Sequence, residues 1–118
     1  MHELSLAGEI HRACRSRLAA GDARRLVRVR VAVGDLAAVE PDLLRYAWTA
    51  ITASGPDAGA ELVVEWRPAS QRCESCGARP ERPPGSWWPA CPRCGQAMRI
   101  EGGDALDLLE FSHAPAPA

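Results

Sequence analysis

The alternation of apolar and polar residues predicts a helix at the start of this chain. Apolar residues recur there at helical spacing while polar residues face elsewhere; they are Leu6, Ile10, Ala13, Cys14 and Leu18. This pattern predicts an amphipathic helix over about 4–20. Gly21 suits its end, because glycine accepts the left-handed conformation that closes a helix.

Three later segments have the period of two that is typical of strands. The clearest is RLVRVRVAVG at 25–34, where four valines alternate with Arg28, Arg30 and Ala32. A second strand is predicted in ELVVEWR at 61–67, with Leu62, Val64 and Trp66 on one face, and Pro68 closes it. DALDLLEF at 104–111 predicts a third strand.

A second helix is predicted between the first two strands. Pro41 suits the first turn of a helix, and Asp42 suits its positive end. Leu44, Ala47, Trp48 and Ile51 then follow at helical spacing, and SGP at 54–56 ends the helix.

The order is therefore helix, strand, helix, strand, a segment rich in cysteine and proline, and a last strand. We expect an α+β fold with two helices packed on one face of a three-stranded sheet, to which the last strand returns. Residues 1–68 with 103–112 would form the main domain, and 69–102 an inserted zinc-ribbon-like module with four cysteines. The alanine and proline of 113–118 predict a disordered tail.

Composition restricts the class of function. The 118 residues are 47% hydrophobic, and 14 basic residues face 15 acidic ones for a net charge of −1. This balance argues against non-specific nucleic-acid binding and gives no support for attachment to a membrane surface. We see no signal peptide and no apolar run of about 20 residues, so we expect a cytoplasmic protein.

Two cysteine pairs carry the clearest chemistry. They read Cys73-Glu-Ser-Cys76-Gly and Cys91-Pro-Arg-Cys94-Gly, and 14 residues separate them. This spacing predicts one tetrahedral Zn²⁺ held by four thiolates, which leaves no open position and makes the zinc structural. Iron, a pair of disulfides and a redox dithiol are the alternatives, although thiols stay reduced in the cytoplasm.

The amino terminus offers a second set of metal donors. The α-amine of Met1, the amide and imidazole of His2, and the amide or carboxylate of Glu3 would form adjacent chelate rings around one ion. A nitrogen-rich tetragonal set suits Ni²⁺ or Cu²⁺. The alternative is an exposed histidine at a helix start, followed by an acid that the helix dipole favours.

Other residues have plainer interpretations. Cys14 belongs to the apolar core, and His11 and His113 are surface residues. The arginines of 24–30 form the solvated face of a strand, with a docking patch for an acidic partner as the alternative. Trp87 and Trp88 would pack beside the metal or dock a partner. Glu40 is a candidate for orienting the amino-terminal metal site from the turn before the second helix. We find no Ser/His/Asp set, phosphate-binding glycine loop or carboxylate pair, so we expect no enzyme.

The whole order of motifs resembles the HypA/HybF family of hydrogenase nickel-incorporation metallochaperones. The resemblance rests on MHELSLA, VRVRVAVGDLAAVEPDLLRYAW, AELVVEW, the two cysteine pairs and GDALDLLE, and it extends from Met1 to about Glu110. The second pair continues Cys-Gly-Gln where Cys-Gly-Ser is more usual. The pair Trp87 and Trp88 is unusually bulky, and the tail lies outside the resemblance.

The resemblance implies a nickel-binding domain and a zinc domain. Met1, His2 and Glu3 would carry Ni²⁺, with the His2 side chain indispensable, and Cys73, Cys76, Cys91 and Cys94 would hold structural Zn²⁺. The family delivers nickel with a partner GTPase to the large subunit of nickel–iron hydrogenase, and some relatives serve urease maturation. We expect this chain to be a monomer or weak dimer. The alternatives are a zinc-ribbon adaptor for nucleic acid or protein, and a thiol oxidoreductase.

Overall fold

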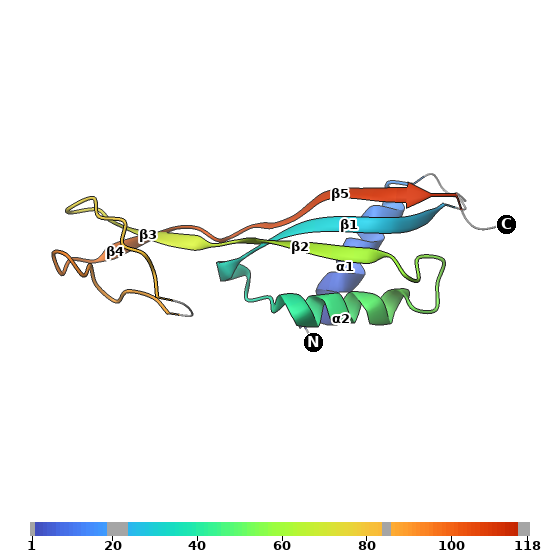
Figure 1. Ribbon diagram of the computed structural model, residues 1–118, viewed down its shortest axis with the longest axis horizontal. Coiled ribbons are helices and arrows are strands. Elements are labelled where there is room, and N and C mark those ends of the chain that lie inside the picture. Colours follow the sequence, from blue (N-terminus) through green and yellow to red (C-terminus); the bar gives the residue numbers. More distant parts are fainter. Residues whose placement is uncertain (1, 19–23, 84–85, 116–118) are drawn as a thin grey trace.

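The computed structural model describes residues 2–18, 24–83 and 86–115, and its principal extents are 65 × 23 × 17 Å. Along the chain it forms α1 (His2–Ser16), β1 (Arg25–Gly34), the 3-10 turn η1 (Asp35–Ala37), α2 (Pro41–Thr52), β2 (Glu61–Arg67), β3 (Ala69–Cys73), β4 (Met98–Gly102) and β5 (Leu106–Ala114). Figure 1 shows both helices beside β1, β2 and β5, while β3 and β4 extend away from them. Within the described ranges, no helix has the length and apolar character needed to cross a bilayer.

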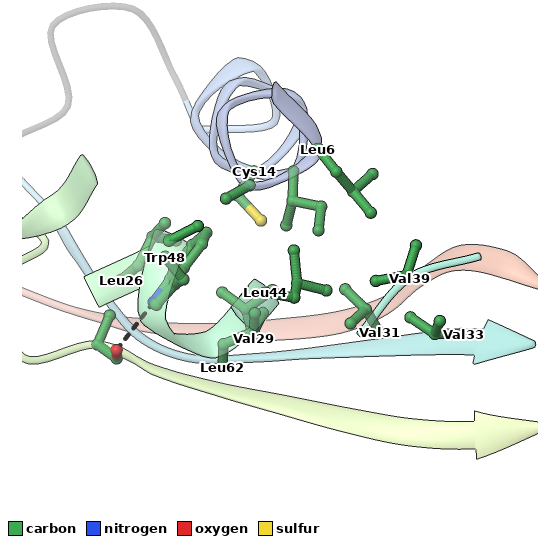
Figure 2. Packing of buried hydrophobic residues seen from close by; sticks show 14 residues of the cluster. Leu6, Cys14, Leu26, Val29, Val31, Val33, Val39, Leu44, Trp48 and Leu62 are labelled. Carbon is green, nitrogen blue, oxygen red and sulfur yellow. Dashed lines mark hydrogen bonds between the residues drawn. The ribbon is translucent and has the colours of Figure 1, made fainter. Parts of the chain in front are cut away.

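The main sheet has the strand order β2-β1-β5. β1 is parallel to β2 and antiparallel to β5, so the last strand does return to the first one. Side chains of α1 and α2 point together toward this sheet, which places both helices on the same face (Figure 2). The predicted α+β fold is confirmed, and the cysteine segment is inserted between β2 and β5.

The hydrophobic core lies between the two helices and this sheet. α1 contributes Leu6, Ile10 and Cys14, and α2 contributes Leu44 and Trp48. Burying each large side chain stabilises the fold by about 1.5–3 kcal/mol. The fully buried Trp48 also satisfies its ring N–H, which donates to the carbonyl oxygen of Ala60 at 2.9 Å.

β1 has the predicted bounds but not the predicted alternation. The later valines of the strand are buried, whereas Val27 is exposed and its neighbour Leu26 is fully buried. The pairing with β5 shifts register between Leu26 and Arg28. A bulge here turns the preceding residues over, because a slip of one residue exchanges the faces of a strand.

The helix boundaries agree with the prediction for α2 and differ for α1. α2 begins at Pro41 and ends at Thr52, just before SGP, and the Glu40 carboxylate caps it by accepting from the N–H of Leu43 at 2.9 Å. α1 begins at His2, earlier than predicted, and ends at Ser16. The predicted stop at Gly21 lies outside the described residues.

The inserted segment contains a two-stranded sheet that the hydrophobic pattern did not predict. β3 pairs antiparallel with β4 from Ala69↔Gly102 to Cys73↔Met98. β5 begins at Leu106, and the predicted disordered tail is wrong at His113 and Ala114, which pair with the start of β1. These residues are ordered by main-chain hydrogen bonds, which composition alone does not reveal.

The two sheets meet where main chains approach closely. A Cβ atom on Gly34 would lie 2.1 Å from the carbonyl oxygen of Gly103. Gly103 has a φ of 75°, and a Cβ atom there would lie 2.5 Å from that of Ala69. Only glycine fits at both positions, because a side chain would displace the main chain opposite.

Candidate metal sites

The four predicted cysteines converge at the end of the molecule formed by β3 and β4. Each Sγ atom lies within 4.8 Å of the others. Two contacts join one pair to the other, at 3.5 Å between Cys73 and Cys94 and at 3.7 Å between Cys76 and Cys91. A tetrahedron of thiolates around Zn²⁺, with bonds of about 2.3 Å, has sulfur–sulfur edges of about 3.8 Å. The four donors therefore fit one zinc ion shared by both pairs.

The main chain holds the two pairs in the same way. Cys73 N–H donates to Ala78 at 2.9 Å, and Cys91 N–H donates to Gln96 at 2.8 Å. The glycine after each pair donates back to the first cysteine and has a positive φ, 75° at Gly77 and 79° at the second glycine. The glycines thus close two equivalent turns, as the sequence predicts.

The environment of Cys73 also favours the metal-binding form of its thiol. Main-chain N–H groups, chiefly that of Cys76, lower the pKa of the Cys73 thiol to about 6. All five cysteines are free thiols. A thiolate is the form that binds metal, and four thiolates leave no coordination position for a substrate, so the chemistry of this site is structural.

Cys14 has the opposite character. It is fully buried in α1, and burial raises the pKa of its thiol to about 11. It is therefore a core side chain, as the sequence analysis predicts, and not a metal ligand.

His2 and Glu3 form the start of α1, and Glu3 lies next to the start of α2. Met1 falls outside the described residues. The His2 side chain is 55% exposed, and its Nδ1 lies 3.6 Å from Oε2 of Glu3. The Glu3 carboxylate also accepts from the N–H of Glu40 at 3.4 Å. Two candidate residues are thus adjacent at an accessible helix end.

Glu40 connects this terminus to α2. Main-chain N–H groups, those of Glu3 itself and of Glu40, hold the pKa of the Glu3 carboxyl below its usual value. Meanwhile the Glu40 carboxylate caps α2. Its contact with Glu3 therefore runs through the main chain, and the side chain serves the helix.

The basic run of β1 is balanced by acidic neighbours. Arg28 pairs with Glu61 at 3.2 Å, and Arg30 pairs with Glu65 and with Glu110. These charges lie across neighbouring strands, so this part of the run is a paired sheet face. The pairing weakens the alternative of a docking patch for an acidic partner.

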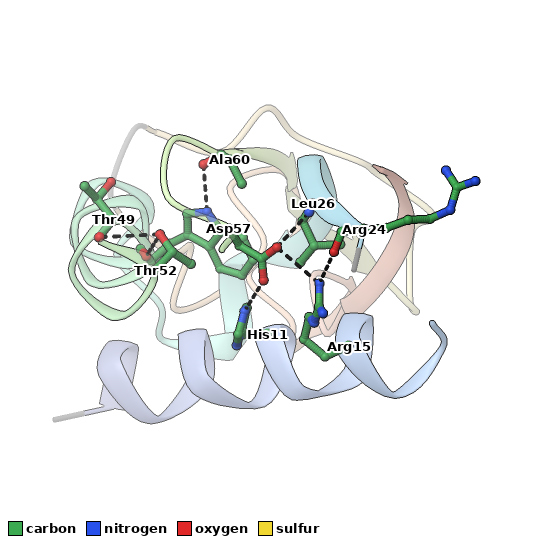
Figure 3. A network of polar contacts seen from close by, with 9 residues as sticks. His11, Arg15, Arg24, Leu26, Thr49, Thr52, Asp57 and Ala60 are labelled. Atoms are coloured by element: carbon green, nitrogen blue, oxygen red, sulfur yellow. Dashed lines mark hydrogen bonds and ion pairs between the residues drawn. The ribbon is translucent and has the colours of Figure 1, made fainter. Parts of the chain in front are cut away.

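His11 belongs to a polar network that sequence reasoning missed. Asp57, which is 1% exposed, accepts from the N–H of Leu26 at 2.7 Å, and His11 Nε2 lies 2.7 Å from its carboxylate. Arg15 Nη1 donates to Asp57 at 3.3 Å and to the carbonyl of Arg24 at 2.8 Å (Figure 3). One carboxylate thus joins α1, β1 and the loop before β2. The only sequence clue was a histidine at the edge of the apolar stripe.

Comparison with known proteins decides the family. A family model described as "HypA: Hydrogenase/urease nickel incorporation, metallochaperone, hypA" matches residues 1–112. The chain belongs to this family. It is a nickel metallochaperone of hydrogenase maturation, and this membership favours the metallochaperone over the adaptor and the oxidoreductase.

Relatives match over nearly their whole length. The hydrogenase maturation factor HypA of Chlorobaculum tepidum is 34% identical over 113 residues, which are 95% of this chain and 98% of the relative. HypA of Methanocella arvoryzae is 32% identical over 113 residues, 94% and 98% of the two chains. The HypA resemblance is thus confirmed along the chain.

Solved structures show the same fold. The solution structure of the Ni metallochaperone HypA from Helicobacter pylori has a TM-score of 0.59 and 19% identity, and covers 96% of this chain and 97% of that one. A second solution structure of a HypA protein has a TM-score of 0.60 and 20% identity, with 97% of each chain covered. At these TM-scores both structures share the fold of this chain.

Proposed function

We propose that this chain captures Ni²⁺ with donors of Met1, His2 and Glu3. It passes the ion by ligand exchange to a maturation GTPase, for insertion into the large subunit of nickel–iron hydrogenase in the cytoplasm. Urease maturation is the second route that the family description includes. The chain acts as a carrier and catalyses no reaction of its own. The observation that carries the proposal is that α1 begins at His2.

This helix boundary leaves the required nitrogens available. The first four N–H groups of an α-helix have no partner within the helix, and those of His2 and Glu3 are among them. The half-exposed imidazole of His2 completes a chelate with its own amide nitrogen and the preceding amine. Ni²⁺ favours such a nitrogen-rich tetragonal set, and an accessible terminus lets the ligands of a partner attack the bound ion.

Contacts around Glu3 support an ordered site. Its carboxylate, anchored by the N–H of Glu40, lies beside the imidazole of His2. The contact is on the Nδ1 side of the ring, and Nδ1 is the imidazole nitrogen that forms a chelate ring with the His2 amide. The Glu3 carboxylate therefore lies where it offers a further donor to the same ion.

The cysteine cluster has a separate role in this proposal. Cys73, Cys76, Cys91 and Cys94 hold a structural zinc ion that orders 69–102, while 1–68 with 103–112 form the nickel-binding unit. The sulfur geometry and the absence of an open position support this division of labour.

An extended amino terminus is expected to abolish high-affinity nickel binding. Two residues added before Met1 convert the α-amine into a peptide nitrogen and remove one chelate ring. His2→Ala removes another donor and should have the same effect. Calorimetric titration of Ni²⁺ into the zinc-loaded chain measures both.

Matched controls distinguish the site from general damage. Two residues added after Ala118, and His113→Ala, should both keep the native affinity. His113 is an exposed histidine near the carboxyl end of the chain. Its Nδ1 lies 3.4 Å from Nη1 of Arg24. If the amino-terminal extension and His2→Ala also keep that affinity, the proposed site is wrong.

Nickel binding is also expected to weaken as the pH falls from 8 to 6. An amine and an imidazole ordinarily take up protons at about 7.8 and 6.5, and affinity falls about tenfold per pH unit for each proton that the metal must displace. The Glu3 carboxyl, whose pKa is held below its usual value, stays anionic in this window. Glu3→Gln should therefore keep the same pH slope in a competition assay, and an affinity independent of pH would contradict this donor set.

A further inference from the structure

Among the residues that the structure describes, the hydrophobic core cluster does not extend across the joint between the two sheets. The core formed by the described residues lies in α1, β1, α2, β2 and the segments joining them. Two segments of the chain connect this core to the cysteine module. One passes through Pro68, and the other passes through Gly102 and Gly103, which both have a positive φ. Orientation of the module therefore depends on contacts made at the joint itself.

Asp35 makes two such contacts from the first residue of η1. Its Oδ2 accepts from the N–H of Ala69 at 2.8 Å, at the start of β3. The same atom accepts from Nη2 of Arg82 at 2.7 Å, and Arg82 belongs to the segment between the cysteine pairs. Both side chains are largely shielded, at 14% exposed for Asp35 and 18% for Arg82. A shielded, charge-assisted bond is stronger than a surface ion pair.

Trp87 holds Arg82 in place from the other side. The guanidinium carbon of Arg82 lies 3.8 Å from the centre of the Trp87 ring. A stacked guanidinium keeps its edge free for hydrogen bonds, so Arg82 can bind the ring and Asp35 together.

Trp88, the residue after Trp87, joins the segment between the cysteine pairs to Gln71 of β3. Gln71, which is 4% exposed, donates from Nε2 to the carbonyl of Trp88 at 3.0 Å and accepts from its N–H at 2.8 Å. The Trp88 ring N–H donates to the carbonyl of Glu81 at 3.1 Å. Gln71 stands two residues before Cys73, so the segment that carries Arg82 is tied directly to the metal-binding strand.

We propose that Asp35, Arg82 and Trp87 form a latch that holds the cysteine module in one orientation on the nickel-binding half. Trp88 and Gln71 anchor the module side of the latch, and η1 anchors the other side. Trp87 and Trp88 thus both stabilise contacts within the chain. The inference does not depend on where nickel binds.

The test compares the motion of the two units in the zinc-loaded full chain by NMR. In the native chain, residual dipolar couplings of both units should fit one alignment tensor, and ¹⁵N relaxation should give one correlation time. Arg82→Gln and Trp87→Leu should each lose this common tensor, and the module should acquire a shorter correlation time. Zinc content and the shifts of the β1–β5 sheet should not change.

Arg79→Gln is the matched control. Arg79 lies in the same segment and pairs with Glu101 at 2.8 Å, wholly within the module. It should keep the common tensor. The latch is refuted if the native chain already needs two tensors, or if both latch variants keep one. Loss of zinc from Arg82→Gln but not from Arg79→Gln would also overturn it, because the contact would then serve metal binding.

Discussion

Removing zinc is expected to unfold the cysteine module and leave the helical half, formed by α1, α2 and the β2-β1-β5 sheet, folded. The module buries few side chains, among them Ala69, Gln71 and two of its cysteines, and it lies outside the hydrophobic core. Structural zinc sites supply about 10–16 kcal/mol of binding free energy, which is folding free energy when little else orders the segment. Chelation, or Cys91→Ser, should collapse the amide dispersion of 69–102 while β1 and β5 keep theirs.

A cysteine outside the cluster supplies the control for this experiment. Cys14→Ala changes a thiol that is fully buried in the core, and elemental analysis should still find one zinc ion per chain. If Cys91→Ser also keeps one equivalent of zinc, or if the module stays dispersed after chelation, the structural role of the metal is wrong.

Replacing Asp57 is expected to destabilise the helical half by about 3 kcal/mol. Breaking a buried ion pair by removing one partner costs about 3–5 kcal/mol. We expect the lower end because the side chains of His11 and Arg15 are 29% and 28% exposed and can regain water. Asp57→Ala also leaves the N–H of Leu26 without its acceptor. Urea unfolding of the zinc-loaded chain, followed by far-UV circular dichroism, measures the loss.

Two further variants make the result specific. Asp57→Asn keeps an acceptor for the N–H of Leu26 but loses the charge. It should therefore lower the free energy of unfolding by less than Asp57→Ala does. Glu61→Ala breaks an exposed pair with Arg28, 3.2 Å long, within the same half of the molecule and should cost less than about 1 kcal/mol. Equal stability of Asp57→Ala and Glu61→Ala would contradict the stabilising role of the Asp57 contacts.

Local chemistry explains what could be predicted. The period of two in β1 and the Pro41 start of α2 depend on neighbouring residues, so their bounds follow from the sequence. The paired cysteines were recognisable because two intervening residues allow both sulfurs to reach one ion. The bulge at Leu26–Arg28 could not be predicted, since it arises from the register with β5.

The long-range polar contacts of Asp57 and Asp35 could not be predicted from neighbouring residues. Asp57 follows SGP in an ordinary-looking loop, and Asp35 follows Gly34 in a turn. Their partners His11 and Arg82 lie 46 and 47 positions away along the chain. No periodicity marks a carboxylate that will be buried against a distant cation.

The sequence alone thus determined the two helices, the three main strands and the four paired thiols, and it predicts the donors at the amino terminus. Each depends on residues close together in the chain, where spacing and side-chain type settle the local structure. Only the tertiary structure decided the β3–β4 sheet, the contacts of Asp57 with His11 and Arg15, and the contact of Asp35 with Arg82. These form when the folded main chain brings distant segments together, because a hydrogen bond depends on the positions of both partners in space.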